Sequence, residues 1–277
     1  MYNCSMKRLA IFAHYDKDNI IDDYVIYYLR ELKKSFETII FVSDSDLPKE
    51  ETNKIIDFVD YIQAYHHGEY DWGSYKYGYL IARKNNLLMN TDELLFCNDS
   101  VYGPIYSINS VLEAMAHDDC GFWGLYENKI GLNSQVEPHL QSWFLVMKKV
   151  VFLSDKFDDF VLSISKKQDK LEIIRDYEIG FTKEMSKYFS YSSAFSSDRT
   201  NAVVAAAPKL LKNGFPFLKS VVFKKYYIKL KKMVSSELYT AMLKHSARIN
   251  KEIPLIKFVR TMKWNSKMRK YIVQKNY

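Results

Sequence analysis

Hydrophobic and polar positions alternate in blocks through the first hundred residues. Short, mostly apolar runs typical of buried strands lie at 9–14, 38–42 and 93–97, and a third strand is predicted at 59–64. Between the first two runs, apolar side chains recur at helical spacing from Ile20 to Phe36, with Lys33 and Lys34 near the end, where cations suit the helix dipole. Strands that alternate with helices predict an α/β fold, with a mainly parallel sheet covered by helices on its faces.

The later part of the chain continues the pattern and then changes character. We expect helices at 74–83 and 106–116, strands at 120–126 and 139–147, and a helix that opens at the polar turn around Glu178. Residues 192–201 are rich in serine and are predicted to form a loop. From Ser220 onward Lys and Arg are frequent and aromatic residues are interleaved with them. We therefore predict a main domain over 1–219 and a basic helical extension over 220–277.

Charge and cysteine content narrow the classes of partner and compartment. The 277 residues carry a formal net charge of +7, which favours anionic partners such as nucleotide sugars, acidic lipid headgroups or nucleic acid. No known nucleic-acid motif accompanies the basic residues, so nucleic acid is the poorest of these partners. Cys4, Cys97 and Cys120 show no C-x-x-C spacing, which predicts a reducing compartment.

The apolar patterning also bears on location. Met1 to Arg8 lack the apolar run of a secretory signal, and the chain has no run of about 18 apolar residues, so we expect a cytoplasmic protein. The basic, aromatic-bearing extension suits an anionic membrane face. A solvated helical face that covers the sheet is an equally weighted alternative.

The triplet Asn98-Asp99-Ser100 is the principal candidate for chemistry. It follows the apolar run 93–97 and precedes a Gly-Pro turn, so it sits where a strand opens into a loop. Ligands of α/β sheets bind at the carboxyl ends of strands. A carboxylate there can hold a divalent cation against a diphosphate. The alternative is that these three residues are simply good turn formers.

Other polar positions carry weaker signals. The loop 67–78 could stack a base or sugar ring while Lys76 or Arg83 meets phosphate, and we single out Asp71 and Lys76 as donor-binding candidates. The alternative is a helix N-terminus with Asp71 and Ser74 as caps. His139 and Gln141 lie on the polar leading edge of a predicted strand that could face an acceptor, although a lone histidine is more often structural. Glu178 suits a general base, or merely the dipole at a helix start.

Several stretches, taken together, resemble the rhamnan synthesis protein F family of glycosyltransferases, which build bacterial rhamnose-containing cell-wall and O-antigen polysaccharides. The resemblance runs from about Leu9 to Lys225, and the order and spacing of the stretches make it specific as a set. The matching stretches are residues 68–76, 98–104, 139–144 and 177–182, with 214–219 similar to the family's closing motif.

The resemblance implies a GT-A-type nucleotide-sugar fold with Asn98-Asp99-Ser100 in the place of the D-x-D metal motif. Only Asp99 remains as a charged ligand for Mg²⁺ or Mn²⁺, which puts metal dependence in doubt. Glu178 would be the general base, and Lys219 would clamp phosphate. From topology, we expect the ends of the first two strands to cradle the nucleotide through His14, Tyr15, Ser43 and Asp44.

The function that these features imply is an inverting glycosyltransferase. It would move a sugar, rhamnose or another hexose, from a dTDP- or UDP-linked donor to a polyprenyl-diphosphate-linked glycan at the inner face of the plasma membrane. The alternative is a non-catalytic module on a transferase fold, which would hold glycan or tether an assembly.

Overall fold

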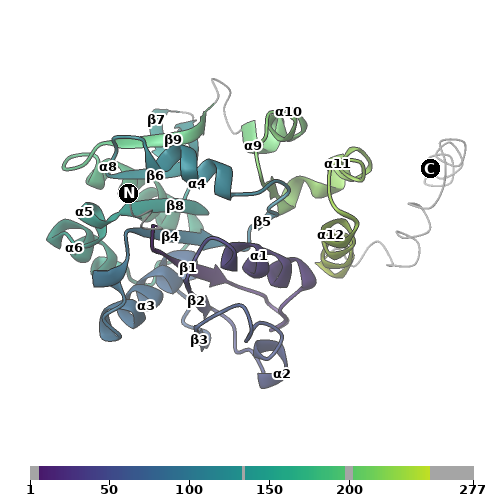
Figure 1. The fold of residues 1–277 in the computed structure, drawn as a ribbon, viewed down its shortest axis with the longest axis horizontal. Helices are drawn as coiled ribbons and strands as arrows, with labels where there is room; N and C mark the ends of the chain where they lie inside the picture. The colour runs from purple at the N-terminus through teal and green to yellow at the C-terminus, as the bar shows by residue number, and fades with distance from the viewer. Residues whose placement is uncertain (1–5, 133–134, 197–201, 250–277) are drawn as a thin grey trace, which may run out of the picture.

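The computed structural model describes residues 6–132, 135–196 and 202–249. Its centre is one mixed sheet in the order β3-β2-β1-β4-β8-β6-β7, with β9 beside β6 (Figure 1). The strands are β1 (Arg8–His14), β2 (Thr38–Ser43), β3 (Tyr61–Ala64), β4 (Glu93–Asn98), β6 (Phe122–Ile130), β7 (Val136–Leu140), β8 (Phe144–Lys148) and β9 (Tyr191–Ser196). A separate antiparallel pair joins β5 (Val101–Tyr102) to β10 (Leu218–Lys219).

Helices cover the sheet. They are α1 (Asp23–Lys33), α2 (Lys49–Thr52), α3 (Tyr70–Lys84), α4 (Asn109–Ala116), α5 (Lys149–Phe152), α6 (Asp155–Ser163), α7 (Lys170–Ile173), α8 (Gly180–Met185), α9 (Ala202–Ala205), α10 (Ala207–Lys212), α11 (Phe223–Leu230) and α12 (Ser236–Ile249). Single turns are η1 (Leu88–Asn90), η3 (Ile174–Ile179) and η4 (Ser220–Val222). The predicted helices at 20–36, 74–83 and 106–116 correspond to α1, α3 and α4.

The packing of the first strands of the sheet explains why their sequences are mostly apolar. Strands β3, β2, β1 and β4 pair in parallel, and helices lie on both faces, so β1, β2 and β4 bury both sets of side chains, whereas the edge strand β3 stays partly exposed. Ala10 and Phe12 point into the core that contains α1, whereas Leu9 and Ile11 point into the core that contains α3. The predicted α/β fold with a mostly parallel sheet is confirmed. Beyond β4 the sheet also contains antiparallel pairs, because β8 runs antiparallel to both β4 and β6.

Three predicted elements were wrong in detail. The strand expected at 139–147 is two strands, β7 and β8, separated by Gln141, Ser142 and Trp143. The helix expected to open near Glu178 begins earlier, at Lys170, and Glu178 lies inside its π-helical turn η3. In the serine-rich stretch 192–201, expected to be loop, residues 192–196 belong to β9 because they pair in parallel with β6, whereas 197–201 lie outside the described residues.

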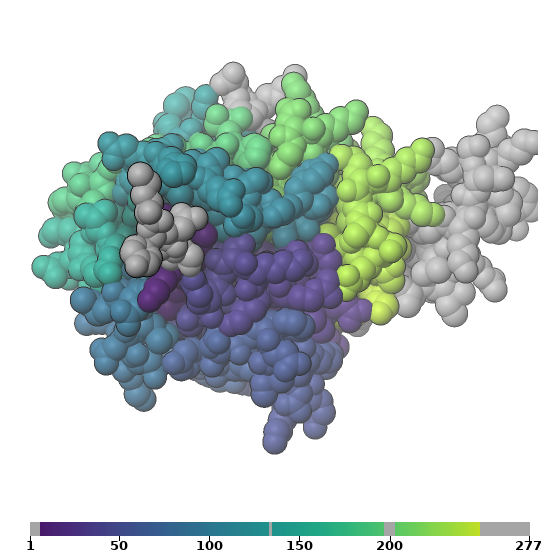
Figure 2. Space-filling view, in the orientation of Figure 1, coloured from purple at the N-terminus to yellow at the C-terminus, as the bar shows by residue number. Residues whose placement is uncertain are grey.

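The end of the described chain packs back onto its beginning. Helix α12 lies against α1, and α11 lies beside α12, so the yellow-green and purple segments adjoin in Figure 2. Within the described ranges, no helix is long and apolar enough to cross a membrane. The division into 1–219 and 220–277 stays a prediction, because 250–277 lie outside the described residues.

Candidate functional site

Asn98 anchors the turn that follows β4. Its Oδ1 accepts hydrogen bonds from the backbone N–H of Ser100 at 3.0 Å and from the Ser100 hydroxyl at 2.6 Å. Its Nδ2 donates to Oδ2 of Asp71, at the start of α3, over 2.6 Å. The Asn98 side chain is buried and joins the strand end to the first turn of α3. An amide suits this place because it donates to one neighbour and accepts from another, which a carboxylate cannot do.

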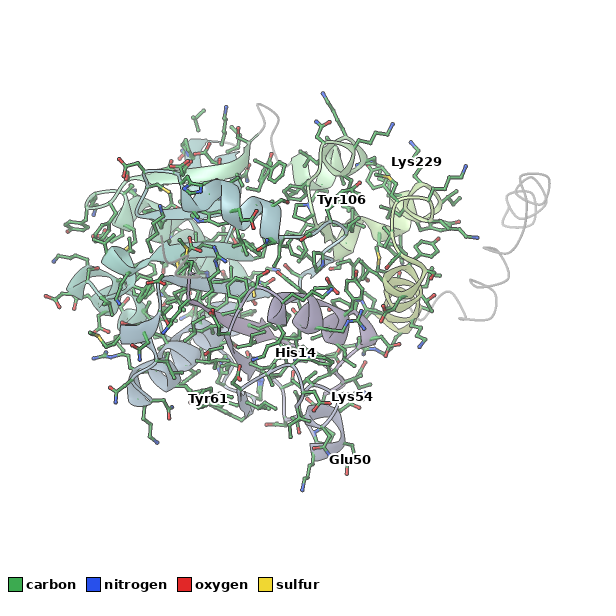
Figure 3. The ribbon with its side chains drawn as sticks, viewed as in Figure 1. His14, Glu50, Lys54, Tyr61, Tyr106 and Lys229 are labelled. Carbon is green, nitrogen blue, oxygen red and sulfur yellow. The ribbon has the colours of Figure 1, made fainter. Side chains whose placement is uncertain are left out.

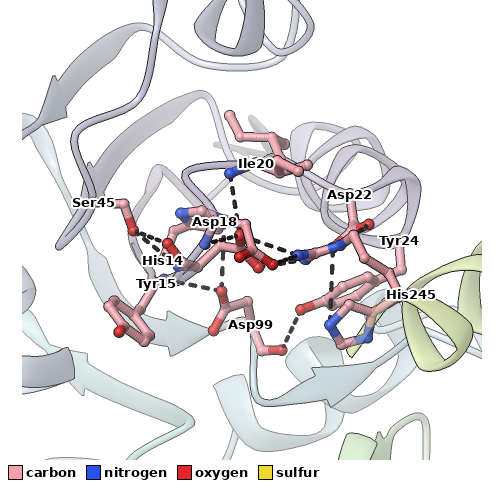
Figure 4. A network of polar contacts seen from close by, with 12 residues as sticks. His14, Tyr15, Asp18, Ile20, Asp22, Tyr24, Ser45, Asp99 and His245 are labelled. Carbon is pink, nitrogen blue, oxygen red and sulfur yellow. Dashed lines mark hydrogen bonds and ion pairs between the residues drawn. The ribbon is translucent and has the colours of Figure 1, made fainter. Parts of the chain in front are cut away.

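Asp99 faces the end of the neighbouring strand β1 (Figure 4). Its Oδ2 accepts the backbone N–H of Tyr15 at 3.0 Å, and its carbonyl oxygen accepts the hydroxyl of Tyr24 at 3.0 Å. Burial raises the pKa of the Asp99 carboxyl well above its usual value, the Tyr15 N–H opposes this, and Asp71 adds to it. A partner that brings positive charge would therefore favour the ionised form of Asp99.

His14 closes the β1 side of this group. Its Nδ1 pairs with the Ser43 hydroxyl at 2.8 Å, and its Nε2 lies 3.8 Å from Oδ2 of Asp99. Burial lowers the pKa of His14 to about 4, so the ring is neutral near pH 7. The contact with Asp99 is then not an ion pair. His14 lies inside the molecule, at the carboxyl end of its strand (Figure 3).

Lys219 brings a cation to the same turn from far along the chain. Strand β10 pairs with β5 so that Lys219 lies opposite Val101, and its Nζ donates to the Ser100 hydroxyl at 3.0 Å. The ammonium also sits over the Trp143 ring, 5.1 Å from its centroid. Burial lowers the pKa of Lys219 to about 8, while the negative charges of Glu178 and Asp71 oppose that shift.

Glu178 lies in the π-helical turn η3, and its negative charge acts on Lys219. Its Oε2 accepts the hydroxyl of Ser142 at 3.1 Å, and its Oε1 lies 3.9 Å from Nε2 of His139. The Glu178 side chain keeps a quarter of its surface, 25%, exposed, whereas His139 is buried. Nδ1 of His139 contacts the carbonyl of Glu137 at 2.8 Å. Glu178 is thus fixed on one side and open to solvent on the other, and π turns often occur at functional sites.

Four predicted site residues are engaged by the protein itself. Asp44 accepts backbone N–H groups of His67 and Gly68, each at 2.8 Å, and of Tyr70 at 3.3 Å. Lys76 is paired with Glu69 and donates to the carbonyl of Ile164. Gln141 accepts the indole N–H of Trp143 at 2.7 Å, and Ser43 pairs with His14. The roles of these four residues in ligand binding stay predictions, and their observed contacts stabilise the surrounding loops.

The donor set does not form a complete metal site. Among the described residues, no group of three or more His, Cys, Asp or Glu side chains is arranged to hold a metal ion. In the triplet 98–100, Asp99 is the one carboxylate, Asn98 donates to Asp71, and the ammonium of Lys219 donates to Ser100. These residues do not fit a cation held by protein ligands alone, because hard cations need several oxygen donors.

Three residues that the sequence did not single out complete the arrangement. Ser142 holds Glu178, and Trp143 supports Lys219. Arg248 of α12 pairs with Asp16, with Asp18 at 2.9 Å and with Asp22 at 2.5 Å, and so holds the loop that carries Tyr15. Each of these contacts joins segments far apart in the chain, so no local sequence pattern could reveal it.

A cavity elsewhere on the molecule is not part of this group. It measures about 460 Å³, lies between α1 and α12, and is lined by Tyr27 and by the pairs Arg30–Glu237 and Asp23–Lys244. It contains none of the strand-end residues described above. We interpret this cavity as a gap left where α1 packs against α12.

Comparisons with known proteins give a family. A family model described as rhamnan synthesis protein F matches residues 39–277. The uncharacterized protein y4gN of Sinorhizobium fredii is 24% identical over 194 residues, which are 69% of this chain but only 49% of that protein, so the match spans about half of the relative's length.

Solved structures are similar at a lower level. Core-mannan synthase A of Aspergillus fumigatus, in its Mn/GDP form, has a TM-score of 0.41 and 9% identity, with 67% of this chain and 71% of that chain covered. The inositol-1-phosphate CTP transferase of T. maritima has a TM-score of 0.43 and 12% identity, with 69% and 86% covered. Likeness at this level assigns no activity.

Proposed function

This chain belongs to the rhamnan synthesis protein F family, and on that premise we propose that it is an inverting glycosyltransferase that uses a nucleoside-diphosphate sugar. The observation that carries the proposal is the position of Lys219. Its ammonium lies on Ser100 of the strand-end triplet, and the charges of Asp71 and Glu178 act on it. A phosphate-binding cation and a candidate base thus share one site at the carboxyl end of β4.

On the donor side, the diphosphate would lie at the turn 98–100. A leaving diphosphate gains negative charge in the transition state, and fixed positive charge there lowers the barrier. Lys219 supplies that charge from a position already ordered by Ser100 and Trp143. A divalent cation, Mg²⁺ or Mn²⁺, shared between Asp99 and the diphosphate stays an expectation, and the titration below tests it.

On the acceptor side, Glu178 would act as the general base. Inversion needs a base within hydrogen-bond reach of the attacking hydroxyl, on the face opposite the leaving group. The hydrogen bond from Ser142 orients one carboxylate oxygen of Glu178, and the partly exposed side chain leaves room for a sugar hydroxyl. His139, beside the other oxygen, would then contact the acceptor or hold the base.

The substrates follow from the family and the charge balance. We propose a dTDP- or UDP-linked hexose, rhamnose among them, as donor and a polyprenyl-diphosphate-linked glycan as acceptor, for a cell-surface polysaccharide of the O-antigen, capsule or rhamnan type. The chain would act in the cytoplasm at the inner face of the plasma membrane, and the basic C-terminal extension would meet that membrane. The net charge of +7 suits each of these anionic partners.

A thermal-shift titration with UDP, dTDP and GDP, each with and without Mg²⁺ or Mn²⁺, tests the donor site. A nucleotide that binds only the folded protein must raise the unfolding midpoint. We expect one nucleotide to raise it selectively, and donor turnover in the presence of a lipid-linked acceptor to follow the same nucleotide. No shift with any nucleotide, together with no turnover, would instead favour the alternative of a non-catalytic glycan- or assembly-binding module.

A further inference from the structure

The chain from 203 to 235 carries positive charge without any acidic side chain. Its charged residues are Lys209, Lys212, Lys219, Lys224, Lys225, Lys229, Lys231 and Lys232. Lys219 turns into the site, and the other seven lysines are exposed on α10, α11 and the turn that follows α11. Helices α10 and α11 contact each other, so these lysines belong to neighbouring elements (Figure 1). The result is a strongly cationic surface.

The exposed side of α11 also contains aliphatic side chains. Val221, in η4 just before the helix, is 78% exposed, and Ile228 is 42% exposed. Residues 221, 224, 225, 228, 229 and 232 follow helical spacing and are all exposed, whereas Phe223 and Leu230 on the other side are buried in the core. Lys229 extends from α11 at the rim of the molecule (Figure 3). We call this stripe of exposed residues the α11 face.

From this pattern we propose that the α11 face, with Lys209 and Lys212 of α10, docks on the surface of an anionic lipid bilayer. Lysines on such a face are attracted to anionic headgroups, and aliphatic side chains among them enter the headgroup region. The exposed Val221 and Ile228 favour a bilayer over nucleic acid, because a phosphate backbone rewards charge and offers nothing to an isolated aliphatic side chain.

The α11 face lies next to the candidate site. Lys219 precedes Val221 by two residues, and the backbone and hydroxyl of Ser220 both donate to the carbonyl of Ser100. The segment that would touch the bilayer is therefore bonded to the strand-end triplet. The step from docking to the acceptor rests on the proposed function. Given that function, this contact would present a lipid-carried acceptor to Glu178 from the membrane side.

Sedimentation of the full chain with phosphatidylcholine vesicles, with and without phosphatidylglycerol, tests the proposal. We expect binding only to the anionic vesicles. The triple variant Lys224→Glu, Lys229→Glu, Lys232→Glu should lower the partition coefficient at least about tenfold, because each lysine near an anionic surface contributes to binding. The matched control Lys84→Glu, Lys156→Glu, Lys187→Glu reverses three exposed lysines on α3, α6 and the turn after α8 and should change it little.

Two further measurements separate docking on a bilayer from its alternatives. Val221→Ser with Ile228→Ser should weaken vesicle binding at high salt, where the lysine contribution is screened. Equal loss in the two triple variants, or a higher affinity for a mixed single-stranded oligonucleotide than for the anionic vesicles, would overturn the proposal. Vesicle binding requires no turnover, so its failure is distinct from a failure of the glycosyltransferase assignment.

Discussion

The ammonium of Lys219 donates a hydrogen bond to the hydroxyl of Ser100 over 3.0 Å, although 119 residues separate the two in the chain. The short pairing of β10 with β5 creates this contact, since it places Lys219 opposite Val101. The same hydroxyl of Ser100 donates to Asn98, so the cation and the turn after β4 are tied together. Lys219 thus adds a positive charge beside this turn.

Replacing Lys219 should weaken nucleotide binding. Lys219→Met keeps most of the side chain's volume and removes the charge, and a lost charged hydrogen bond costs about 1.5–3 kcal/mol, or about tenfold to a hundredfold in affinity. Isothermal titration calorimetry with the nucleoside diphosphate measures the change. Lys209→Met, on the exposed side of α10, is the control. Equal affinities for the two variants would remove Lys219 from the donor site.

The pH dependence of that binding has a defined sign. Burial lowers the pKa of Lys219 to about 8, and Glu178, Asp71 and Lys170 are the charges that act on it. The protonated form binds a diphosphate, so affinity should be full below about pH 8 and fall by up to about tenfold per pH unit above it. Calorimetry from about pH 7 to about pH 10 checks this. The decline should vanish in Lys219→Met, and a decline that persists there belongs to another group.

Replacing Glu178 should separate binding from turnover. Glu178→Gln keeps the oxygen that accepts from Ser142 but removes the base, which contributes about 10²–10⁴-fold to rate. We expect turnover to fall by that factor while the nucleotide still binds. Glu184→Gln, on the next turn of the same helix, is the matched control because Glu184 pairs only locally with Lys187 among the described residues. Unchanged turnover in Glu178→Gln would mean that Glu178 is not the base.

The sequence predicted the parallel half of the sheet well, for a physical reason. Runs such as 39–42 and 94–97 are apolar at every position because helices bury both faces, and such runs are recognisable without other information. The split between β7 and β8 was missed because Gln141-Ser142-Trp143 contains neither Gly nor Pro to mark it. Strand β9 was missed because its serines disfavour a strand locally, and only pairing with β6 orders them.

From the sequence, only the candidate site residues at the ends of strands could be located. His14, Ser43 and Asn98 were placed correctly at carboxyl ends of parallel strands, since topology alone requires it. The supporting contacts could not be predicted. Trp143 under Lys219, and Ser142 on Glu178, depend on the register of β8 and on a π turn, neither of which leaves a local pattern.

A variant of Asp44 can separate its structural role from its predicted role in nucleotide binding. The Asp44 carboxylate accepts three backbone N–H groups at the start of α3 and in the loop before it, so Asp44→Ala leaves partly buried donors without this partner and should cost about 1–3 kcal/mol of unfolding free energy. Urea denaturation measures this loss. Asp46→Ala, a neighbouring exposed acid with one such contact, should cost clearly less. If nucleotide affinity survives in folded Asp44→Ala, the predicted nucleotide contact of Asp44 is removed.

Arg248 should stabilise both the C-terminal helix and the donor side of the site. Its guanidinium pairs with Asp16, Asp18 and Asp22, which lie in and just after the loop that carries Tyr15. Arg248→Met leaves three carboxylates close together without their cation, which should cost about 2–4 kcal/mol, less than a fully buried pair because the Arg248 side chain keeps 21% of its surface exposed. Urea denaturation gives the free energy, and calorimetry on the folded variant gives the nucleotide affinity.

The control for Arg248 is another arginine that joins α1 to α12. Arg30 forms a two-point pair with Glu237, but both side chains are well exposed, so Arg30→Met should cost at most about 1 kcal/mol. Arg248→Lys keeps the charge but loses the planar fork that reaches two carboxylates at once, and it should fall between wild type and Arg248→Met. We expect nucleotide affinity to drop in the Arg248 variants alone, because Asp16 adjoins Tyr15, whose N–H holds Asp99. If the Arg248 variants lose stability but keep nucleotide affinity, then Arg248 holds α12 in place and does not support the donor site.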